Sequence, residues 1–196
     1  DCGKSFSTVG LLHLVCSCPD SELLHVNKTE QEDVEHFAAT CQDELILNPG
    51  ETPLLENLYS YLSTLKTTWM LLHWIEEEKE ETICDDFGVG PGDIYRHVES
   101  MGWLLYAAGM IAELNRFKDL TFVLENLRSR VKYGIREELL ELASLKGVGR
   151  IRARQLFKHG YRKLGDLQFA TAGQISTIKT IGQTLADDIL AQITRR

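Results

Sequence analysis

The sequence lacks several features that would assign it to common protein classes. No apolar run approaches the roughly 20 residues that a membrane-spanning helix needs, so we expect no membrane partner. No basic-then-apolar leader is present, which predicts a cytoplasmic location. The five cysteines include no CxxC pair, which favours free thiols over a disulfide framework or a metal site. The chain begins at Asp1 rather than Met, and we interpret it as part of a longer protein.

A complete nucleotide-binding motif is also missing. The letters GKS at 3–5 match the end of a phosphate loop, but the glycine-rich approach and the preceding strand are absent. The GVGPG stretch at 88–92 fits a turn between two packed helices better than a phosphate loop. We therefore expect no ATP site, no catalytic residue, no metal and no other cofactor in this chain.

The remaining patterns predict an all-α fold. Only four prolines interrupt the chain, and apolar residues recur at intervals of three and four almost throughout. Trp69 and Trp74 are expected core residues of one long helix, and Asp93 is well placed to cap another. The expected segments are helices over 8–18, 30–41, 54–80 and 93–114, a short helix from 81, a linker near 115–121 and two helices broken at Gly134. We place a helical bundle over 1–135 and a small separate helical domain over 136–196.

Charge divides the chain in the same way. Residues 1–115 hold 5 Lys or Arg against 21 Asp or Glu, whereas residues 116–196 hold 16 Lys or Arg against 8 Asp or Glu. The formal net charge of −8 hides this division. A basic half in an acidic chain indicates a contact with nucleic acid.

The basic half contains a glycine hairpin. Residues 145–157, LKGVGRIRARQLF, fit the helix-hairpin-helix pattern, in which Gly147 and Gly149 allow a tight turn with an unshielded backbone. Amides at such a turn, and at the start of the next helix, can face a phosphate oxygen. A plain helical hairpin without a ligand is the alternative.

A second copy of the pattern lies 33 residues further on, at 178–190 (IKTIGQTLADDIL). Its apolar skeleton matches the first, but Thr180 replaces Gly147, and Gln183, Leu185 and Asp187 replace the three arginines. The pair predicts a tandem hairpin domain of about sixty residues in which the first hairpin contacts phosphate and the second completes the core.

The three arginines of the first hairpin are not equivalent. Two-residue steps on a helix rotate by about 200°, so Arg152 points away from Arg150 and Arg154. We expect Arg150, Arg154 and Lys146 to bind phosphate, with Arg152 a weaker candidate. The alternative is that this charge only solvates one helix face.

The long helix that follows Asp93 has an aromatic side chain on the face opposite its apolar stripe. Arg96 and Trp103 lie seven residues apart, about 10 Å along the axis, and their neighbours on this face are the small residues Ser100 and Ala107. A flat ring and a guanidinium on one open face suit stacking on unpaired bases. The alternative is a central helix whose Trp103 packs on a second layer.

The stretches GVGPGDIYRHVESMGWLLYAAGMIAEL and RVKYGIREELLELASLKGVGRIRARQLFKHGYRKLGDL together resemble the C-terminal part of the archaeal superfamily-two DNA repair helicases, relatives of the polymerase-theta-type helicases. The resemblance covers essentially the whole chain and implies a ratchet domain followed by a helix-hairpin-helix domain. It also implies that Arg96 and Trp103 stack on the tracking single strand, and that Arg150, Arg152 and Arg154 belong to the segment that grips the emerging strand.

The resemblance implies further parts that this chain does not contain. The parent enzyme would be an ATP-dependent 3′–5′ DNA helicase of replication-fork repair, with RecA-like motor domains, a winged helix, and ATP and Mg²⁺ upstream. Its partner would be single-stranded or forked DNA. Two other functions remain open: a stand-alone hairpin module that binds DNA, and a protein-interaction domain of an RNA helicase.

Overall fold

The computed structural model of the chain describes residues 6–48 and 57–194, and these form helices joined by turns and loops, with no residue in a strand. The all-α prediction is therefore confirmed. The chain divides into two compact units, residues 1–132 and 133–196, each with its own hydrophobic core. The GKS letters, Cys2 and the predicted helix start at Leu54 lie outside the described residues.

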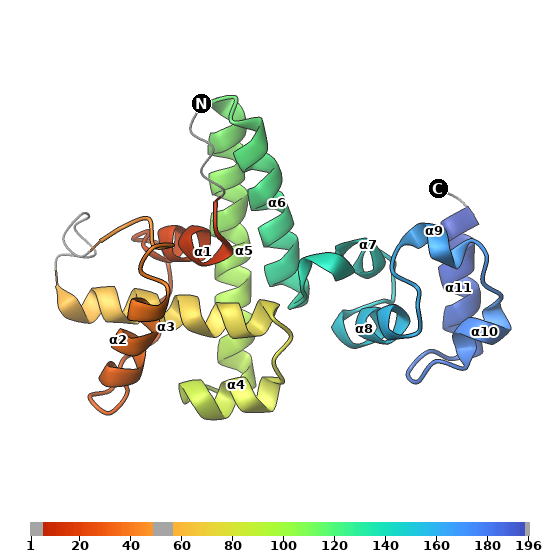
Figure 1. Ribbon diagram of the computed structural model, residues 1–196, viewed down its shortest axis with the longest axis horizontal. Coiled ribbons are helices and arrows are strands. Elements are labelled where there is room, and N and C mark those ends of the chain that lie inside the picture. Colours follow the sequence, from red (N-terminus) through yellow and green to blue (C-terminus); the bar gives the residue numbers. More distant parts are fainter. Residues whose placement is uncertain (1–5, 49–56, 195–196) are drawn as a thin grey trace. The chain divides into compact units, whose positions relative to one another are not determined.

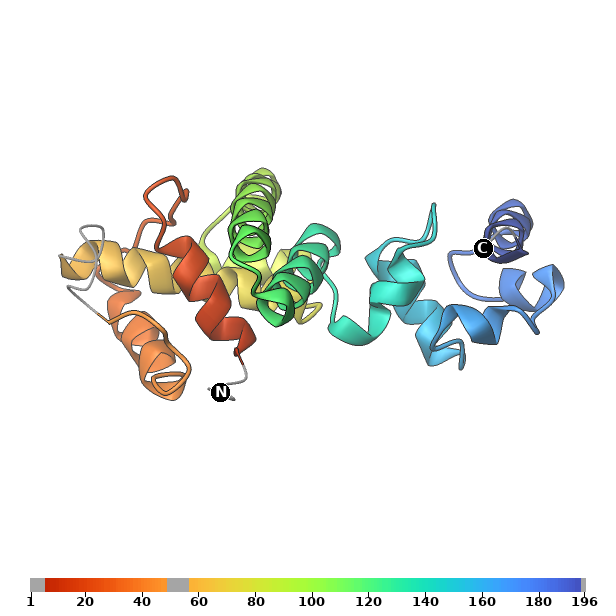
Figure 2. The same ribbon diagram turned by 90° about the horizontal axis from the view of Figure 1, so that it is seen from above.

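The first unit is built around one central helix, α3. Its helices are α1 (Thr8–Cys16), α2 (Gln31–Thr40), α3 (Leu58–Ile75), α4 (Glu80–Phe87), α5 (Pro91–Leu114) and α6 (Lys118–Tyr133). Helix α3 contacts α1, α2 and α4, and α5 contacts α1 and α4. Helices α5 and α6 run side by side as a hairpin in both views (Figures 1 and 2).

Two tryptophans on α3 connect the parts of this core, as the sequence predicted. Trp74 is only 4% exposed, and its indole N–H donates a hydrogen bond of 2.7 Å to the Val131 carbonyl of α6. Trp69 is half-buried, stacks flat on Phe37 at 5.2 Å and meets Phe87 edge-on at 5.1 Å. These contacts join α3 to α2, α4 and α6.

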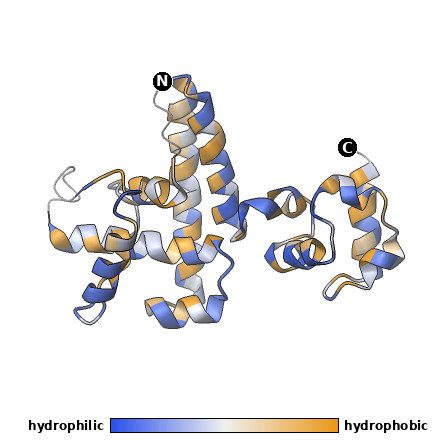
Figure 3. Cartoon of the chain, viewed as in Figure 1, coloured by the Kyte–Doolittle hydropathy of each residue, from blue (hydrophilic) through white to orange (hydrophobic). Residues whose placement is uncertain are grey.

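Helix α3 also buries polar side chains, and the spacing of its apolar residues did not predict this. The hydroxyls of Thr64, Thr67 and Thr68 donate to carbonyls one turn earlier, so burying them leaves no unpaired donor. Lys66 is buried and forms an ion pair of 2.7 Å with Glu30, the residue before α2. The largely hydrophilic α2 (Figure 3) thus borders a helix that has buried residues on most of its sides.

The GVGPG stretch forms the turn between α4 and α5. Gly88 ends α4 in the left-handed conformation, with φ 64°, and Pro91 is the first residue of α5. The Gly90 N–H donates to Asp93 Oδ2 at 2.9 Å. Asp93 therefore caps α5, as the sequence predicted, and it does so from the third helical position because Gly90 and Pro91 start the helix earlier.

Helix α5 buries the predicted stripe and leaves its other side exposed. Ile94, Val98, Met101, Leu105 and Ala112 are all in the core. The helix ends at Leu114 and α6 begins at Lys118, so the connection is shorter than the linker predicted at 115–121. Arg130 fixes α6 to the bundle through Glu76 at 2.9 Å and the Thr8 hydroxyl at 3.2 Å.

The second unit consists of short helices around a core of small and branched residues. A 3₁₀ turn (Glu137–Leu139) precedes α7 (Leu140–Ala143), α8 (Arg150–Lys158), α9 (Leu164–Leu167), α10 (Ala172–Ser176) and α11 (Gln183–Thr194). The sequence placed the domain boundary between residues 135 and 136, three positions from the division between the two units. Across the described ranges of both units, no helix has the length and apolar character needed to cross a bilayer.

Candidate nucleic-acid interface

The outer face of α5 presents the tryptophan that the sequence singled out. Trp103 is 70% exposed, and its ring meets Tyr106 edge-on at 6.1 Å. The buried stripe of α5 lies on the opposite side, so Trp103 contributes nothing to the core contacts of that stripe. A flat aromatic ring that is exposed in this way suits a stacking surface.

Trp103 borders an open groove of about 470 Å³ between α5 and α6. Tyr95 and Tyr106 add aromatic surface, and α6 contributes Arg128 and Lys132. The Arg128 guanidinium lies 4.8 Å from the centre of the Tyr106 ring. One acid, Glu99, also lines the groove. The groove thus combines flat rings for bases with two cations for phosphates.

The two cations of α6 were not predicted as site residues. Arg128 and Lys132 lie four residues apart and therefore on one face of α6. Their spacing could have suggested a shared function. Only the antiparallel packing of α5 and α6, however, brings them beside Trp103.

Arg96 lies on the same outer face of α5 and is held by two carboxylates. Its Nε is 3.0 Å from Glu22 Oε2 and its Nη2 is 2.9 Å from Asp93 Oδ1. Its side chain remains 61% exposed. His97, the next residue, is buried, and loss of water around the ring lowers its pKa below the usual value.

The turn of the first hairpin has the backbone geometry that its glycines predicted. Gly147 has φ 84°, in the left-handed region that strains other residues. A Cβ atom at this position would lie 2.8 Å from Leu185 Cδ1, on the second hairpin. Gly149 is the N-cap of α8, and nothing lies within 4 Å of the place where its Cβ would be. The backbone at the start of α8 is therefore open to an approaching group.

The second hairpin repeats this geometry at an offset of 33 residues. Val148 N–H donates to the Leu145 carbonyl at 3.0 Å, and Ile181 N–H donates to the Ile178 carbonyl at 3.0 Å. Thr180 has φ 79°, close to that of its counterpart Gly147, although it is a β-branched residue. The duplicated pattern in the sequence is thus a duplicated structure.

The two hairpins complete each other's turns. Arg152 Nη1 donates to the Gly147 carbonyl at 2.8 Å, and its Nε donates to the Thr180 carbonyl at 3.0 Å. Leu185, the counterpart of Arg152, packs in return against Gly147. Gln192 of α11 binds the amide of Lys146 at 2.7 Å and its carbonyl at 3.2 Å. Arg152 therefore has partners within the chain at both turns.

The other predicted phosphate ligands differ in their surroundings. Arg154 forms an ion pair of 2.8 Å with Glu138, lies 5.1 Å from the Phe157 ring and is only 21% exposed. Lys146 is exposed at the turn, and Arg150 is half-buried at the first position of α8. The structure therefore brings Lys146, Gly147, Gly149 and Arg150 together at one turn, and it gives Arg154 an acidic partner.

Neither unit gathers the groups that a metal site requires. Within residues 6–48 and 57–194, no three His, Cys, Asp or Glu side chains converge closely enough to hold an ion. The four cysteines in this part of the chain are free thiols, and burial raises the pKa of Cys16 to about 12.

Comparison with known protein families matches the two units separately. Residues 9–134 match the family described as "Archaeal helicase, domain 4". Residues 139–195 match the family described as "SAM-like Helix-hairpin-helix tandem". The groove beside Trp103 belongs to the first match, and both hairpin turns belong to the second.

Curated relatives match nearly the whole chain. A protein of Pyrococcus horikoshii named ATP-dependent DNA helicase Hel308 is 36% identical over 193 residues, which is 98% of this chain. Proteins of the same name from Pyrococcus abyssi and Caldivirga maquilingensis are 35% and 36% identical and cover 95% and 92% of it. The chain spans only about a quarter of the length of these relatives, between 25% and 26%.

Proposed function

The chain belongs to the archaeal helicase domain 4 family and continues into a helix-hairpin-helix tandem, and from this we propose that it is the DNA-binding, strand-guiding part of an ATP-dependent DNA helicase. The observation that carries the proposal is the exposed Trp103 beside a groove lined by cations, on a helix whose other face fills the core. Single-stranded DNA is the proposed ligand.

The α5 face would bind the strand through its bases. Base–aromatic stacking tolerates any sequence because every base has a flat face, which suits a protein that moves along DNA. Trp103 is the proposed stacking platform and Arg96 is its partner two helical turns earlier. Arg128 and Lys132 lie where they can neutralise the phosphates of a strand stacked on Trp103.

The first hairpin would bind the strand through its backbone. The open amides near Gly147 and Gly149 and the start of α8 provide donors for a phosphate oxygen, and Lys146 and Arg150 provide charge. Arg152 and Arg154 support this turn through their internal partners, and we propose that they contribute less to phosphate binding.

ATP and Mg²⁺ would act in other parts of the parent enzyme. The glycine turn at 88–92 does not fit a nucleotide, because the Asp93 carboxylate accepts the Gly90 amide that a phosphate would need. We place ATP hydrolysis, 3′–5′ translocation and fork-repair activity in a longer protein with upstream RecA-like and winged-helix domains, working on forked DNA in the cytoplasm.

Anisotropy of a fluorescent single-stranded oligonucleotide, titrated with this chain over a series of salt concentrations, tests the proposal. The slope of log K against log salt is negative, and we expect Lys146→Gln to make it less steep by about 0.7, the value for one lost contact with a single strand. The matched control is Lys179→Gln, the same charge change at the equivalent position of the second hairpin, and it should leave the slope nearly unchanged. Equal slopes for both variants would contradict the assignment of phosphate binding to the first hairpin.

A further inference from the structure

The loop between α1 and α2 places a carboxylate on the outer face of α5. Glu22 lies in this loop, 74 residues before Arg96 in the sequence, and its Oε2 contacts Arg96 Nε at 3.0 Å. Asp93 holds Arg96 Nη2 at 2.9 Å from within α5. Two acids therefore share one guanidinium, and the cluster carries a net negative charge.

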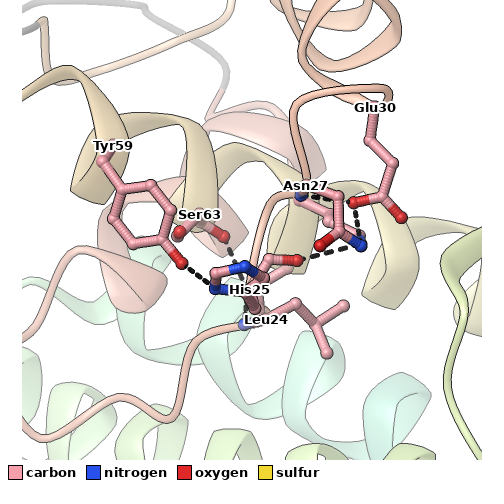
Figure 4. A network of polar contacts seen from close by, with 8 residues as sticks. Leu24, His25, Asn27, Glu30, Tyr59 and Ser63 are labelled. Carbon is pink, nitrogen blue, oxygen red and sulfur yellow. Dashed lines mark hydrogen bonds and ion pairs between the residues drawn. The ribbon is translucent and has the colours of Figure 1, made fainter.

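The backbone around Glu22 is fixed rather than free. The Leu24 amide donates to the Thr67 hydroxyl at 2.9 Å, and the buried Lys66 donates to the His25 carbonyl at 3.0 Å (Figure 4). The Tyr59 hydroxyl contacts the His25 ring, and His97 bonds to the backbone of Glu22. The fold thus holds the backbone from which the Glu22 side chain reaches Arg96.

The two ion pairs use the edge of the guanidinium and leave its faces open. A guanidinium is planar and its N–H groups point outward in that plane, so the carboxylates at Nε and Nη2 occupy the edge on which these two nitrogens would form a forked contact with a phosphate. Stacking on a base uses the flat faces and requires no N–H donor. The local negative charge also disfavours a phosphate at this point.

We propose that Glu22 is a positioning residue that keeps Arg96 as a stacking surface and prevents it from clamping a phosphate. This inference rests on the proposed function of the α5 face. A stacked guanidinium can exchange one base for the next, whereas a forked phosphate contact would hold the strand in place. Glu22 thereby suits the face to a strand that must move past it.

The test is Glu22→Gln in the 196-residue chain, with affinity for a fluorescent oligothymidine measured over a salt series. Loss of the carboxylate frees an edge of Arg96 for phosphate. We expect several-fold tighter binding at low salt and a slope of log K against log salt that is steeper by about 0.7. Asp20→Asn, an exposed acid in the same loop, is the matched control for the change of charge alone.

A third variant shows whether the effect passes through Arg96. In the Arg96→Ala background, Glu22→Gln should no longer steepen the slope, because the guanidinium that it would release is missing. Circular dichroism should show unchanged folding, since the loop is held by backbone contacts. A slope change equal to that of Asp20→Asn, or one that persists without Arg96, would overturn the inference.

The same data separate this inference from the proposed function. If Arg96→Ala and Trp103→Ala both leave binding unchanged, the α5 face does not bind the strand, and both proposals fail. If these two variants weaken binding while Glu22→Gln behaves like Asp20→Asn, only the role of Glu22 is refuted.

Discussion

Replacing Trp103 with Ala should reduce binding at least as much as it reduces stability, and Trp74 provides the opposite case within the same unit. Removing a fully buried tryptophan costs about 3–5 kcal/mol of stability. Trp74 is only 4% exposed, and Trp74→Ala would also leave the Val131 carbonyl without its donor. We therefore expect Trp74→Ala to lower the free energy of unfolding by an amount near the top of that range or above it.

The expected stability loss for Trp103→Ala follows from its exposure. Because 70% of the Trp103 surface is already in water, the substitution removes less than a third of the buried area that a core tryptophan loses. The same fraction of the 3–5 kcal/mol loss in stability is about 1–1.5 kcal/mol. The loss in binding is that of one stacked base, about 1–3 kcal/mol, or roughly a 5- to 150-fold rise in Kd.

Two measurements on each variant decide the outcome. Urea unfolding followed by circular dichroism gives the change in stability, and anisotropy of a fluorescent single strand gives the change in Kd. Phe169→Ala controls for loss of an exposed ring elsewhere, because this side chain is 89% exposed in the second unit. A stability loss for Trp103→Ala as large as that of Trp74→Ala, with normal binding per folded molecule, would refute the assignment of Trp103 to the strand.

Three further outcomes can be checked directly. Burial lowers the pKa of His13 from 6.5 to about 4, so the folded state favours the neutral ring. The contribution of His13 to the free energy of unfolding should be complete above pH 6.5 and should fall by about 3 kcal/mol as the pH is lowered to 4. Urea unfolding of His13→Leu should therefore depend less on pH than that of the unchanged chain. Gly147→Ala should lower the free energy of unfolding by about 1–2 kcal/mol because φ is 84° at this position. Thr180→Gly should leave it unchanged or raise it by up to about 1 kcal/mol, and thermal unfolding measures both effects. The purified chain should hydrolyse no ATP with or without DNA; turnover above a mock preparation would contradict this.

The sequence predicted those features that depend on local spacing. The interval between apolar residues placed the core stripe of α5 correctly and put Trp103 opposite to it, because a regular helix fixes both faces. The glycine pattern located both hairpins, since the left-handed turn at Gly147 is a local requirement of the backbone. The roles of the site residues in binding DNA stay predictions.

Features that depend on long-range packing could not be predicted in this way. Arg152 bonds to the Thr180 carbonyl, and Arg154 pairs with Glu138, only because the fold brings these segments together. Glu22 reaches Arg96 through a loop with no regular period. The burial of the α3 hydroxyls was also not predicted. These hydroxyls donate to carbonyls of their own helix, so their polarity does not exclude them from a core.

The contacts between the two hairpins also set an order of assembly during synthesis. Thr180, Leu185 and Gln192 all contribute to the geometry of the turn at 146–149, and all three follow it in the chain. The first hairpin leaves the ribosome before these residues do. The turn is therefore completed only when α11 has emerged, and a product truncated before α11 would expose the glycines without the geometry that makes them useful.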